Sequence, residues 1–159
     1  MADMIPGLVI RRYQPHDLEE VWILHNTALE DAGFNAGNGP WDDDLRHIEA
    51  SYLQPGGEFV VGTLDKLIVA MGAFKPIDGA KAELKRMRVH PRFQRKGYGQ
   101  AILEALESLA AKAGYTSLHL DTPEGHLAAQ RFYLKNGYVQ TGATKIGQFD
   151  ALLYEKKLS

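Results

Sequence analysis

The segment that most constrains the fold is residues 82–113, which reads AELKRMRVHPRFQRKGYGQAILEALESLAAKA. Residues 82–89 are predicted to form a strand. Pro91 ends it, because proline disfavours helix at the preceding residue and cannot donate a ladder hydrogen bond. Over residues 97–113 the apolar side chains recur at the spacing of one helix face. The segment therefore predicts a strand, a glycine-rich loop and a helix in direct succession.

The loop between this strand and helix, QRKGYG at residues 94–99, has the features of an anion site. A helix start leaves backbone N–H groups unpaired and carries the positive end of the helix dipole. Gly97 and Gly99 lack a Cβ, so a phosphate group can approach the backbone, and Arg95 and Lys96 add positive charge. The dinucleotide fingerprint does not match because its third glycine is missing. The Walker A loop does not match because the lysine after its second glycine is missing. Taken alone, the loop suits a solvent-exposed turn as well as a phosphate cradle.

The rest of the chain predicts an α/β fold with a mixed sheet and helices on its faces. The other expected strands are residues 8–13, 58–64, 66–74, 116–122, 138–142 and 148–158, and the other expected helices are residues 16–31, 41–53 and 127–135. The element order is then βααβββαβαββ. The chain has 159 residues without a repeat or a linker, so a single domain over residues 1–159 is predicted.

Two local patterns near the N-terminus add detail to the first two helices. Asp17 followed by Glu20 has the spacing of a capping box at the start of the first helix. In the second helix, four apolar or aromatic residues share one face and are expected to be buried. They are Trp41, Leu45, Ile48 and Tyr52.

The composition excludes several classes of protein. The chain is 45% apolar and 24% charged, and it contains neither an apolar run near the ~20 residues of a membrane span nor a secretory leader, so a cytoplasmic protein without membrane contact is predicted. It has no cysteine, which excludes disulfides, thiolate metal sites and a covalent cysteine intermediate. No metal site is predicted. The net charge of -2 argues against nucleic-acid binding, although cations concentrate in residues 81–96.

Two blocks of the sequence resemble the GNAT superfamily of N-acetyltransferases. Gln-x-x-Gly-x-Gly after a strand, at residues 94–99, resembles the family's loop for the pyrophosphate of acetyl-CoA. HLAAQRFYLKNGYVQTG, at residues 126–142, resembles the family's helix that carries Ala and Tyr and is followed by Asn-Gly. The resemblance implies the GNAT fold, a mixed, mostly antiparallel seven-stranded sheet flanked by about four helices.

The same resemblance implies the reaction and its cosubstrate. An enzyme of this family moves an acetyl group from acetyl-CoA to a primary amine, which attacks the thioester directly in a ternary complex. The acceptor stays open as a small-molecule or peptide amine. A homodimer is compatible with the resemblance, but no segment of this sequence requires one.

The resemblance places the cofactor against three parts of the chain. Backbone N–H groups at residues 87–89 correspond to the strand that holds pantetheine and the thioester carbonyl, where the next strand is expected to splay away. The loop at residues 94–99 corresponds to the pyrophosphate site. His126 stands where many family members have an asparagine that contacts the CoA arm, and an imidazole can also donate a hydrogen bond. The predicted cofactor-binding residues are Met87, Arg88, Val89, Gln94, Arg95, Lys96, Gly97, Tyr98, Gly99 and His126.

The predicted catalytic residues are Tyr133 and Glu83, and each has an alternative role. Tyr133 matches the family tyrosine that protonates the departing thiolate, but its helix position also suits core packing. Glu83 resembles the glutamate that serves some family members as general base, directly or through a water. Between Lys81 and Lys85 it also suits a solvated ion pair. His119 is a competing base, since an unperturbed histidine titrates in the useful range.

The acceptor pocket is expected between the variable parts of the chain: the loop at residues 32–41, the first two helices and the connection at residues 142–149. Asp31 and Asp42 either attract a cationic acceptor or cap helices. Two other functions stay open. One is a non-catalytic module that binds acyl-CoA, against which Tyr133 argues. The other is a nucleic-acid-binding domain that uses the basic residues 85–96, against which the net acidity argues.

Overall fold

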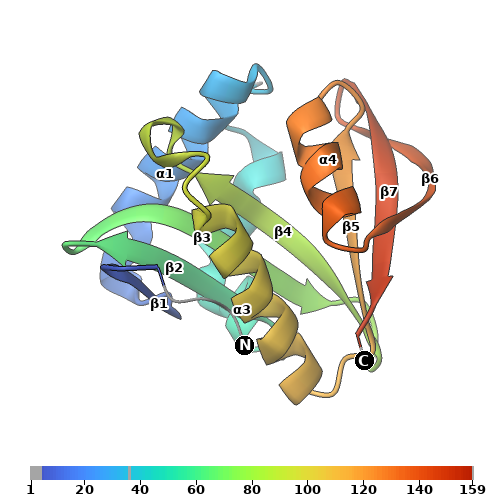
Figure 1. The fold of residues 1–159 in the computed structure, drawn as a ribbon, viewed down its shortest axis with the longest axis horizontal. Helices are drawn as coiled ribbons and strands as arrows, with labels where there is room; N and C mark the ends of the chain where they lie inside the picture. The colour runs from blue at the N-terminus through green and yellow to red at the C-terminus, as the bar shows by residue number, and fades with distance from the viewer. Residues whose placement is uncertain (1–4, 36, 159) are drawn as a thin grey trace.

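The computed structural model describes residues 5–35 and 37–158, and its centre is a seven-stranded sheet (Figure 1). The strands lie in the order β1-β2-β3-β4-β5-β7-β6. All neighbours pair antiparallel except β4 and β5, which are parallel. The strands are β1 (Leu8–Arg12), β2 (Glu58–Leu64), β3 (Leu67–Pro76), β4 (Lys81–Val89), β5 (Ser117–Pro123), β6 (Val139–Ile146) and β7 (Phe149–Lys157). The predicted mixed, mostly antiparallel sheet is confirmed.

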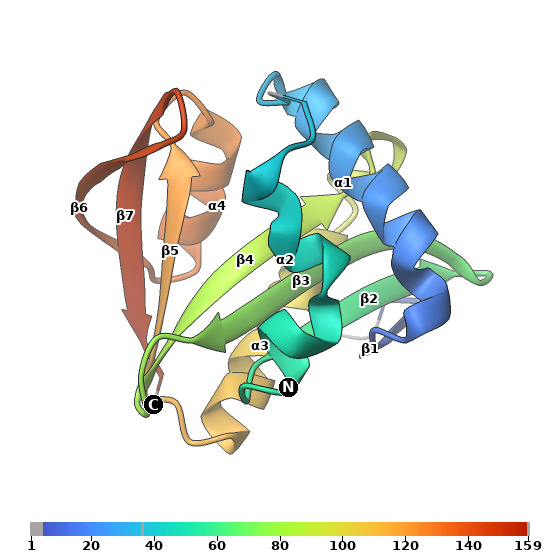
Figure 2. The same ribbon diagram turned by 180° about the vertical axis from the view of Figure 1, so that it is seen from behind.

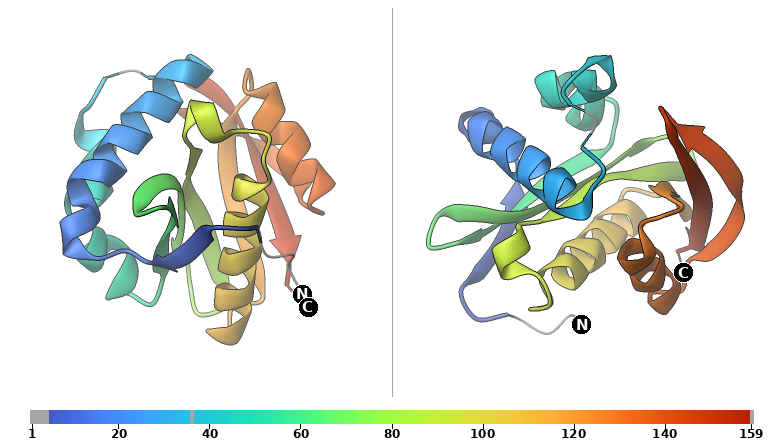
Figure 3. Two further views of the ribbon diagram at one scale, coloured as in Figure 1. Left: turned by 60° about the vertical axis from the view of Figure 1, so that its left-hand side comes forward. Right: turned by 90° about the horizontal axis from the view of Figure 1, so that it is seen from above.

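Helices cover both faces of the sheet. Helices α3 and α4 lie on one face, and α1 and α2 lie on the other (Figures 2 and 3). The α-helices are α1 (Leu18–Ala32), α2 (Asp43–Arg46), α3 (Tyr98–Lys112) and α4 (Leu127–Lys135). Shorter turns are η1 (Pro15–Asp17), η2 (Pro40–Asp42), η3 (Glu49–Leu53) and η4 (Pro91–Phe93). Within residues 5–35 and 37–158, no helix is long and apolar enough to cross a membrane.

Each face of the sheet has its own hydrophobic core, because side chains alternate along a strand. In β2, Val60 packs with Ile102 and Leu106 of α3. Its neighbours Phe59 and Val61 pack instead with the residues of α1 and α2. The two layers of helices are therefore held by opposite faces of the same strands.

The second predicted helix, residues 41–53, is not continuous. It divides into η2, α2 and η3, with a break at His47, whose φ of -139° and ψ of 59° are not helical. The prediction that Trp41 is buried is wrong, since Trp41 is 60% exposed. Leu45, Ile48 and Tyr52 are buried as expected. Tertiary contacts outweigh helix propensity here, because the Leu45 carbonyl accepts from the Trp22 indole and the Tyr52 hydroxyl donates to Asp44.

The predicted capping box at the start of α1 is also wrong. The Asp17 carboxylate accepts two hydrogen bonds from Arg11, at 2.7 and 2.9 Å, and one from the Gln14 N–H. Glu20 accepts from the N–H of Ile68 on β3. Both carboxylates join α1 to neighbouring strands and turns, which a local spacing rule does not foresee.

Candidate active site

A cavity of about 700 Å³ lies where β4 and β5 separate. The two strands pair only through three residues of each, Lys81 to Glu83 with Ser117 to His119, and their C-terminal ends then diverge (Figure 2). The predicted splay is therefore present. Besides these strand ends, the walls come from the end of α1, the residues before α2, the start of α4 and the β6–β7 turn.

A β-bulge in β4 forms one wall of this cavity. The register between β3 and β4 shifts so that Arg86 and Met87 lie opposite the single residue Gly72. Arg86 has a φ of 60°, in the left-handed region. Gly72 is required here, since a Cβ would lie 2.6 Å from the Met87 sulfur and 2.7 Å from Ile102. The bulge thus depends on a close approach between β3, β4 and α3.

Beyond the bulge, the backbone of Val89 faces the gap. The N–H of the next residue, His90, donates to the Val69 carbonyl of β3 at 2.8 Å. Successive residues of an antiparallel strand point their hydrogen-bonding groups to opposite edges, so the Val89 N–H and carbonyl point away from β3. The Val89 carbonyl accepts from the Gln94 side chain at 3.4 Å. This edge of β4 is free of a strand partner because β5 has already turned away.

The loop at residues 94–99 ends in the start of α3, close to the predicted position. Arg95 and Gly97 have φ values of 63° and 86°, which turn the chain into the helix at Tyr98. The first intrahelical bond joins the Ala101 N–H to the Gly97 carbonyl, so the N–H groups before Ala101 lack helical acceptors. A Cβ on Gly99 would lie 3.4 Å from the Val89 side chain, at ordinary van der Waals contact. Such a cradle fits the phosphates of the predicted cofactor.

The side chains of this loop are arranged unequally. Gln94, Arg95 and Lys96 are exposed, where they can meet an anion. The Tyr98 ring is only 8% exposed and packs in the core beneath α3. Tyr98 can therefore contribute to cofactor binding through its backbone alone.

Tyr133 of α4 lines the cavity and is 7% exposed. Its ring packs edge-on against Tyr138, 5.5 Å away between centroids. Burial raises the pKa of Tyr133 to about 12; Arg88 opposes the shift and Asp121 adds to it. Tyr133 thus packs in the core and also borders the cavity, and its role as the acid that protonates the thiolate stays a prediction.

A reciprocal amide pair joins the helix of the loop to the helix of Tyr133. Gln100 donates to Asn136 at 2.7 Å, and Asn136 donates back at 3.0 Å. Asn136 also donates to the Phe132 carbonyl at 2.8 Å. The two sequence blocks that carry the family resemblance are therefore bonded to each other in space.

His126 caps α4, since its Nδ1 accepts from the Ala129 N–H at 3.4 Å. The imidazole stacks on Phe34, with centroids 5.3 Å apart and an interplanar angle of 18°, and Phe149 packs edge-on against Phe34. Burial, with a smaller contribution from Arg88, lowers the pKa of His126. His126 lines the cavity as a neutral ring beside aromatic residues, and its contact with the CoA arm stays a prediction.

Neither of the two bases considered from the sequence lines the cavity. Glu83 lies at the last position of β4 that pairs with β5. Its neighbours across the sheet are Lys75 of β3 and His119 of β5. The His119 ring contacts the Ser117 hydroxyl at 2.8 Å and Glu155 at 3.5 Å. The carboxylates that do border the cavity are those of Asp31, Asp42 and Asp121.

Arg86 is held by a complete set of partners on the α2 side of the sheet. Its guanidinium donates to both oxygens of Asp44, at 2.9 and 2.5 Å, and to the Trp41 carbonyl at 2.8 Å. Burial favours a higher pKa for Asp44, but Arg86 and Tyr52 outweigh it and lower that pKa to about 2. The pair is a structural tie between β4 and α2.

Asp42 is neither a plain helix cap nor an exposed carboxylate. It is 1% exposed, and its Oδ1 lies 3.0 Å from Nε2 of His25, which is equally buried. Burial, together with Arg88 and Arg86, lowers the pKa of His25 well below 6.5 despite Asp42. His25 is therefore neutral, and with Nε2–H bonded to Asp42 its Nδ1 is a buried acceptor with no partner in the described chain.

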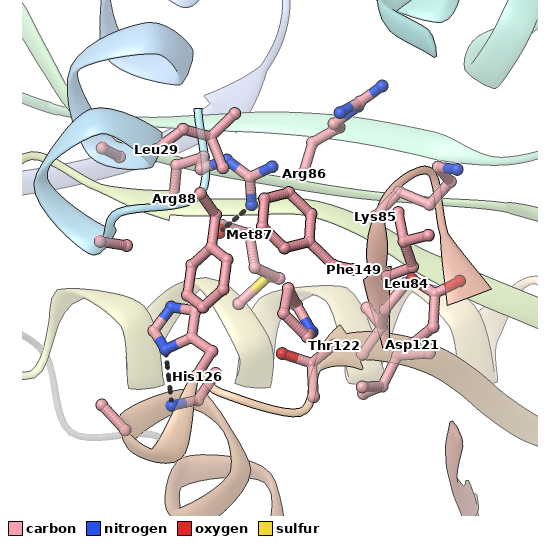
Figure 4. Close-up of a pocket in the computed structure, with 18 of the residues that line it drawn as sticks. Leu29, Leu84, Lys85, Arg86, Met87, Arg88, Asp121, Thr122, His126 and Phe149 are labelled. Atoms are coloured by element: carbon pink, nitrogen blue, oxygen red, sulfur yellow. Dashed lines mark hydrogen bonds between the residues drawn. The ribbon is translucent and has the colours of Figure 1, made fainter. Parts of the chain in front are cut away.

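Arg88 is the second cation of this wall, and its surroundings differ from those of Arg86. Its side chain lines the cavity beside Leu29 and His126 (Figure 4). Nη1 donates to the adjacent Met87 carbonyl at 2.9 Å, and Nε is buried without a partner among the described residues. Burial and the nearby Arg86 lower the pKa of Arg88 to about 10, so it stays cationic at neutral pH.

Sequence reasoning missed the roles of several side chains in this cavity. Arg88 was expected to act through its backbone, and Asp121 was not considered. The sequence did contain a signal for Asp121. It lies two residues after His119 on the same strand, so both side chains lie on one face of the sheet. Asp121 is nearer the end at which β5 separates from β4. No sequence signal separated Arg88 from Arg86, because their difference lies in the partners that the fold brings to them.

Comparison with known proteins agrees with this geometry. The sequence profile described as the acetyltransferase (GNAT) family matches residues 19–138. The chain belongs to that family. Because GNAT acetyltransferases use acetyl-CoA, the predicted cofactor and enzyme class are confirmed with it.

Individual relatives and solved structures support the same assignment. An uncharacterized N-acetyltransferase of Schizosaccharomyces pombe is 29% identical over 130 residues, which cover 80% of this chain and 79% of that protein. An acetyltransferase of Yersinia enterocolitica is 27% identical over 87% of this chain and 93% of its own length. The crystal structure of an acetyltransferase from Streptococcus agalactiae has a TM-score of 0.88 at 24% identity and covers 97% of this chain and 100% of its own. The Streptococcus agalactiae structure has the same fold as this chain.

Proposed function

We propose that this GNAT acetyltransferase moves the acetyl group of acetyl-CoA to a primary amine that attacks directly in a ternary complex. The observation that carries the proposal is the cavity between β4 and β5, which is lined by the free end of β4, by Gln94 of the loop before α3 and by Tyr133. A similar protein, yncA from Salmonella typhimurium, was solved with acetyl-CoA and has a TM-score of 0.77 at 22% identity, covering 96% of this chain and 95% of its own.

The donor end of the site is proposed to hold the thioester and the phosphates of acetyl-CoA. Acetyl-CoA supplies an activated acetyl group when it is bound. The Val89 N–H and carbonyl, on the free edge of β4, are placed to bind an extended amide-bearing arm as a partner strand would be bound. The N–H groups before Ala101, with the exposed Arg95 and Lys96, are placed to bind the pyrophosphate.

Tyr133 is proposed to protonate the leaving thiolate. With a pKa of about 12 against about 8.5 for a thiol, the transfer is uphill, so we expect a modest contribution of about 10²-fold or less. Arg88 lowers the pKa of Tyr133 and so assists this transfer.

A carboxylate is proposed to take the proton from the acceptor ammonium. Asp121 borders the cavity and is our candidate for receiving this proton directly. Glu83 stays a candidate base that acts through a water, because its side chain does not line the cavity. His126 is poorly suited, since its Nδ1 lone pair is used in capping α4 and Nε2 then carries the proton.

An amine panel scored by CoA release tests the proposed function. Tyr133→Phe is expected to lower kcat by up to about 10²-fold with little change in the KM for acetyl-CoA. Tyr138→Phe is the matched control, because the Tyr138 hydroxyl contacts Glu107 and Tyr138 does not line the cavity. Unchanged kcat in Tyr133→Phe, with chemistry rate-limiting, would assign Tyr133 to packing. Asp121→Asn and Glu83→Gln in the same assay identify the base as the carboxylate whose loss flattens the pH–rate profile.

A further inference from the structure

We propose that the acceptor is an amine that carries its own carboxylate, with the α-amino acids as the chemical class, and that Arg88 binds this carboxylate. The inference rests on the proposed function and specifies its substrate. It follows from the Arg88 side chain, whose Nε has no hydrogen-bond partner among the described residues.

A comparison of Arg86 with Arg88 shows how their hydrogen bonding differs. The two residues lie on the same strand, two positions apart, and both border the cavity. Arg86 makes three hydrogen bonds to Asp44 and the Trp41 carbonyl. Arg88 makes one, to the carbonyl of its own neighbour Met87, and leaves Nε buried and unpaired within the described chain. No carboxylate of the described residues forms an ion pair with Arg88, whereas Asp44 and Asp42 both lie within 4 Å of Arg86.

A guanidinium whose Nε is buried and unpaired within the described chain favours the binding of a ligand. An unsatisfied buried donor destabilises a protein, more so when it is charged, and such groups are usually paired. The planar fork of arginine matches a carboxylate, which accepts two parallel hydrogen bonds from it. A carboxylate of the acceptor would pair the Nε–H and would neutralise the charge.

The position of Arg88 favours the acceptor over the cofactor. Met87 and Val89 pack with the core under α3, on the side of the phosphate cradle. Arg88, between them, faces the α1 and α2 side, where its charge acts on His25. The pyrophosphate site already has Arg95 and Lys96.

The rest of the cavity fits the other parts of an amino acid. Asp121 of β5 and Arg88 of β4 both line the cavity, as does Tyr133. The cavity therefore offers an anionic group to an ammonium and a cationic group to a carboxylate, which are the two charges of a zwitterion. The stacked rings of Phe34 and His126, with Phe149 against Phe34, provide an apolar wall for a side chain.

The test compares each α-amino acid with its own α-amide in the CoA-release assay. The panel holds the amino acids, their amides, spermidine and a tripeptide amide. The amide has the more nucleophilic α-amine at neutral pH because its amine pKa is lower, so a preference for the free acid must come from recognition of the carboxylate. We expect at least one amino acid to exceed its amide by about 10²-fold in kcat/KM. Equal rates for acid and amide, or turnover only of amines without a carboxylate, would overturn the inference and leave the proposed function standing.

Variants test whether Arg88 causes the preference for the free acid over the amide. Arg88→Gln is expected to reduce the acid-to-amide ratio to near one, and Arg88→Lys to reduce it by about tenfold, since a lysine keeps the charge without the fork. Lys85→Gln removes another cation of the cavity wall and controls for a general positive field. An unchanged ratio in a folded Arg88→Gln protein would overturn the inference. If the Arg88→Gln protein does not fold, the acid-to-amide ratio of the wild-type protein still tests the inference. The absence of turnover with every amine would overturn the proposed function together with the inference.

Discussion

The two ends of the cavity are built in different ways. The proposed donor end uses residues 86–89 and Gln94 of the cavity wall and, beyond the wall, the N–H groups at the start of α3. It therefore comes from one stretch of chain and uses mainly backbone groups. The proposed acceptor end comes from side chains of α1, of the residues before α2, of β4 and β5, and of the β6–β7 turn. The difference shows that a site made of backbone groups is specified by local sequence, whereas a site made of side chains depends on which elements the fold brings together.

The largest expected effect separates the two arginines of the acceptor end. Arg86→Met should lower the free energy of unfolding by about 3–5 kcal/mol, because it leaves Asp44 partly buried and without its partner. Arg88→Met, two residues away on the same strand, should change it by less than about 1 kcal/mol, since Arg88 has no carboxylate partner among the described residues. Urea unfolding of both variants measures the difference. Equal losses would show that Arg88 is as structural as Arg86.

The second effect concerns the donor end. Acetyl-CoA at 100 times its Kd should stabilise the wild-type protein by about 2.7 kcal/mol, and Gly99→Glu should abolish the shift in melting temperature by placing bulk and negative charge at the phosphate site. Gly99→Gln is the matched control, with similar bulk and no charge. Gly99 is a sharper test than Gly97, whose φ of 86° would add backbone strain to any side chain.

The Gly99 variants should stay folded without cofactor, because a glutamate in the first turn of a helix interacts favourably with the helix dipole. A full shift in a folded Gly99→Glu protein would mean that the phosphates bind elsewhere.

The smallest effect is a pH dependence of folding stability, which the buried pair of His25 and Asp42 should create. An unfolded histidine titrates near pH 6.5, and burial keeps His25 neutral to lower pH in the folded protein. The unfolded state therefore binds more protons below pH 6.5, so stability falls as the pH drops, by about 2 kcal/mol between pH 7 and pH 5 if His25 stays neutral throughout.

His25→Asn keeps a hydrogen bond to Asp42 without a titrating ring and should lose most of this slope. The exposed His47 provides the control, and His47→Asn should keep it. An unchanged slope in His25→Asn, measured by urea unfolding at several pH values, would place the titration at other groups.

Particular elements show how far the sequence could be read. The glycines at 97 and 99 and the tyrosine at 133 stand in local patterns, and the structure brings their helices together through Gln100 and Asn136. The helix predicted at residues 41–53 failed, because contacts with Trp22, His25 and Arg86 decide its course. Local spacing contains no information about such partners.

The sequence by itself determined the order of strands and helices, the family and the donor, because glycine conformation, helix starts and side-chain periodicity act over a few residues. The tertiary structure alone decided which of two neighbouring arginines has carboxylate partners and which has none among the described residues. It also decided which carboxylates reach the cavity: Asp121 does, while Glu83 does not. Burial and pairing are properties of residues far apart in the chain, and they set the charges that an acceptor meets.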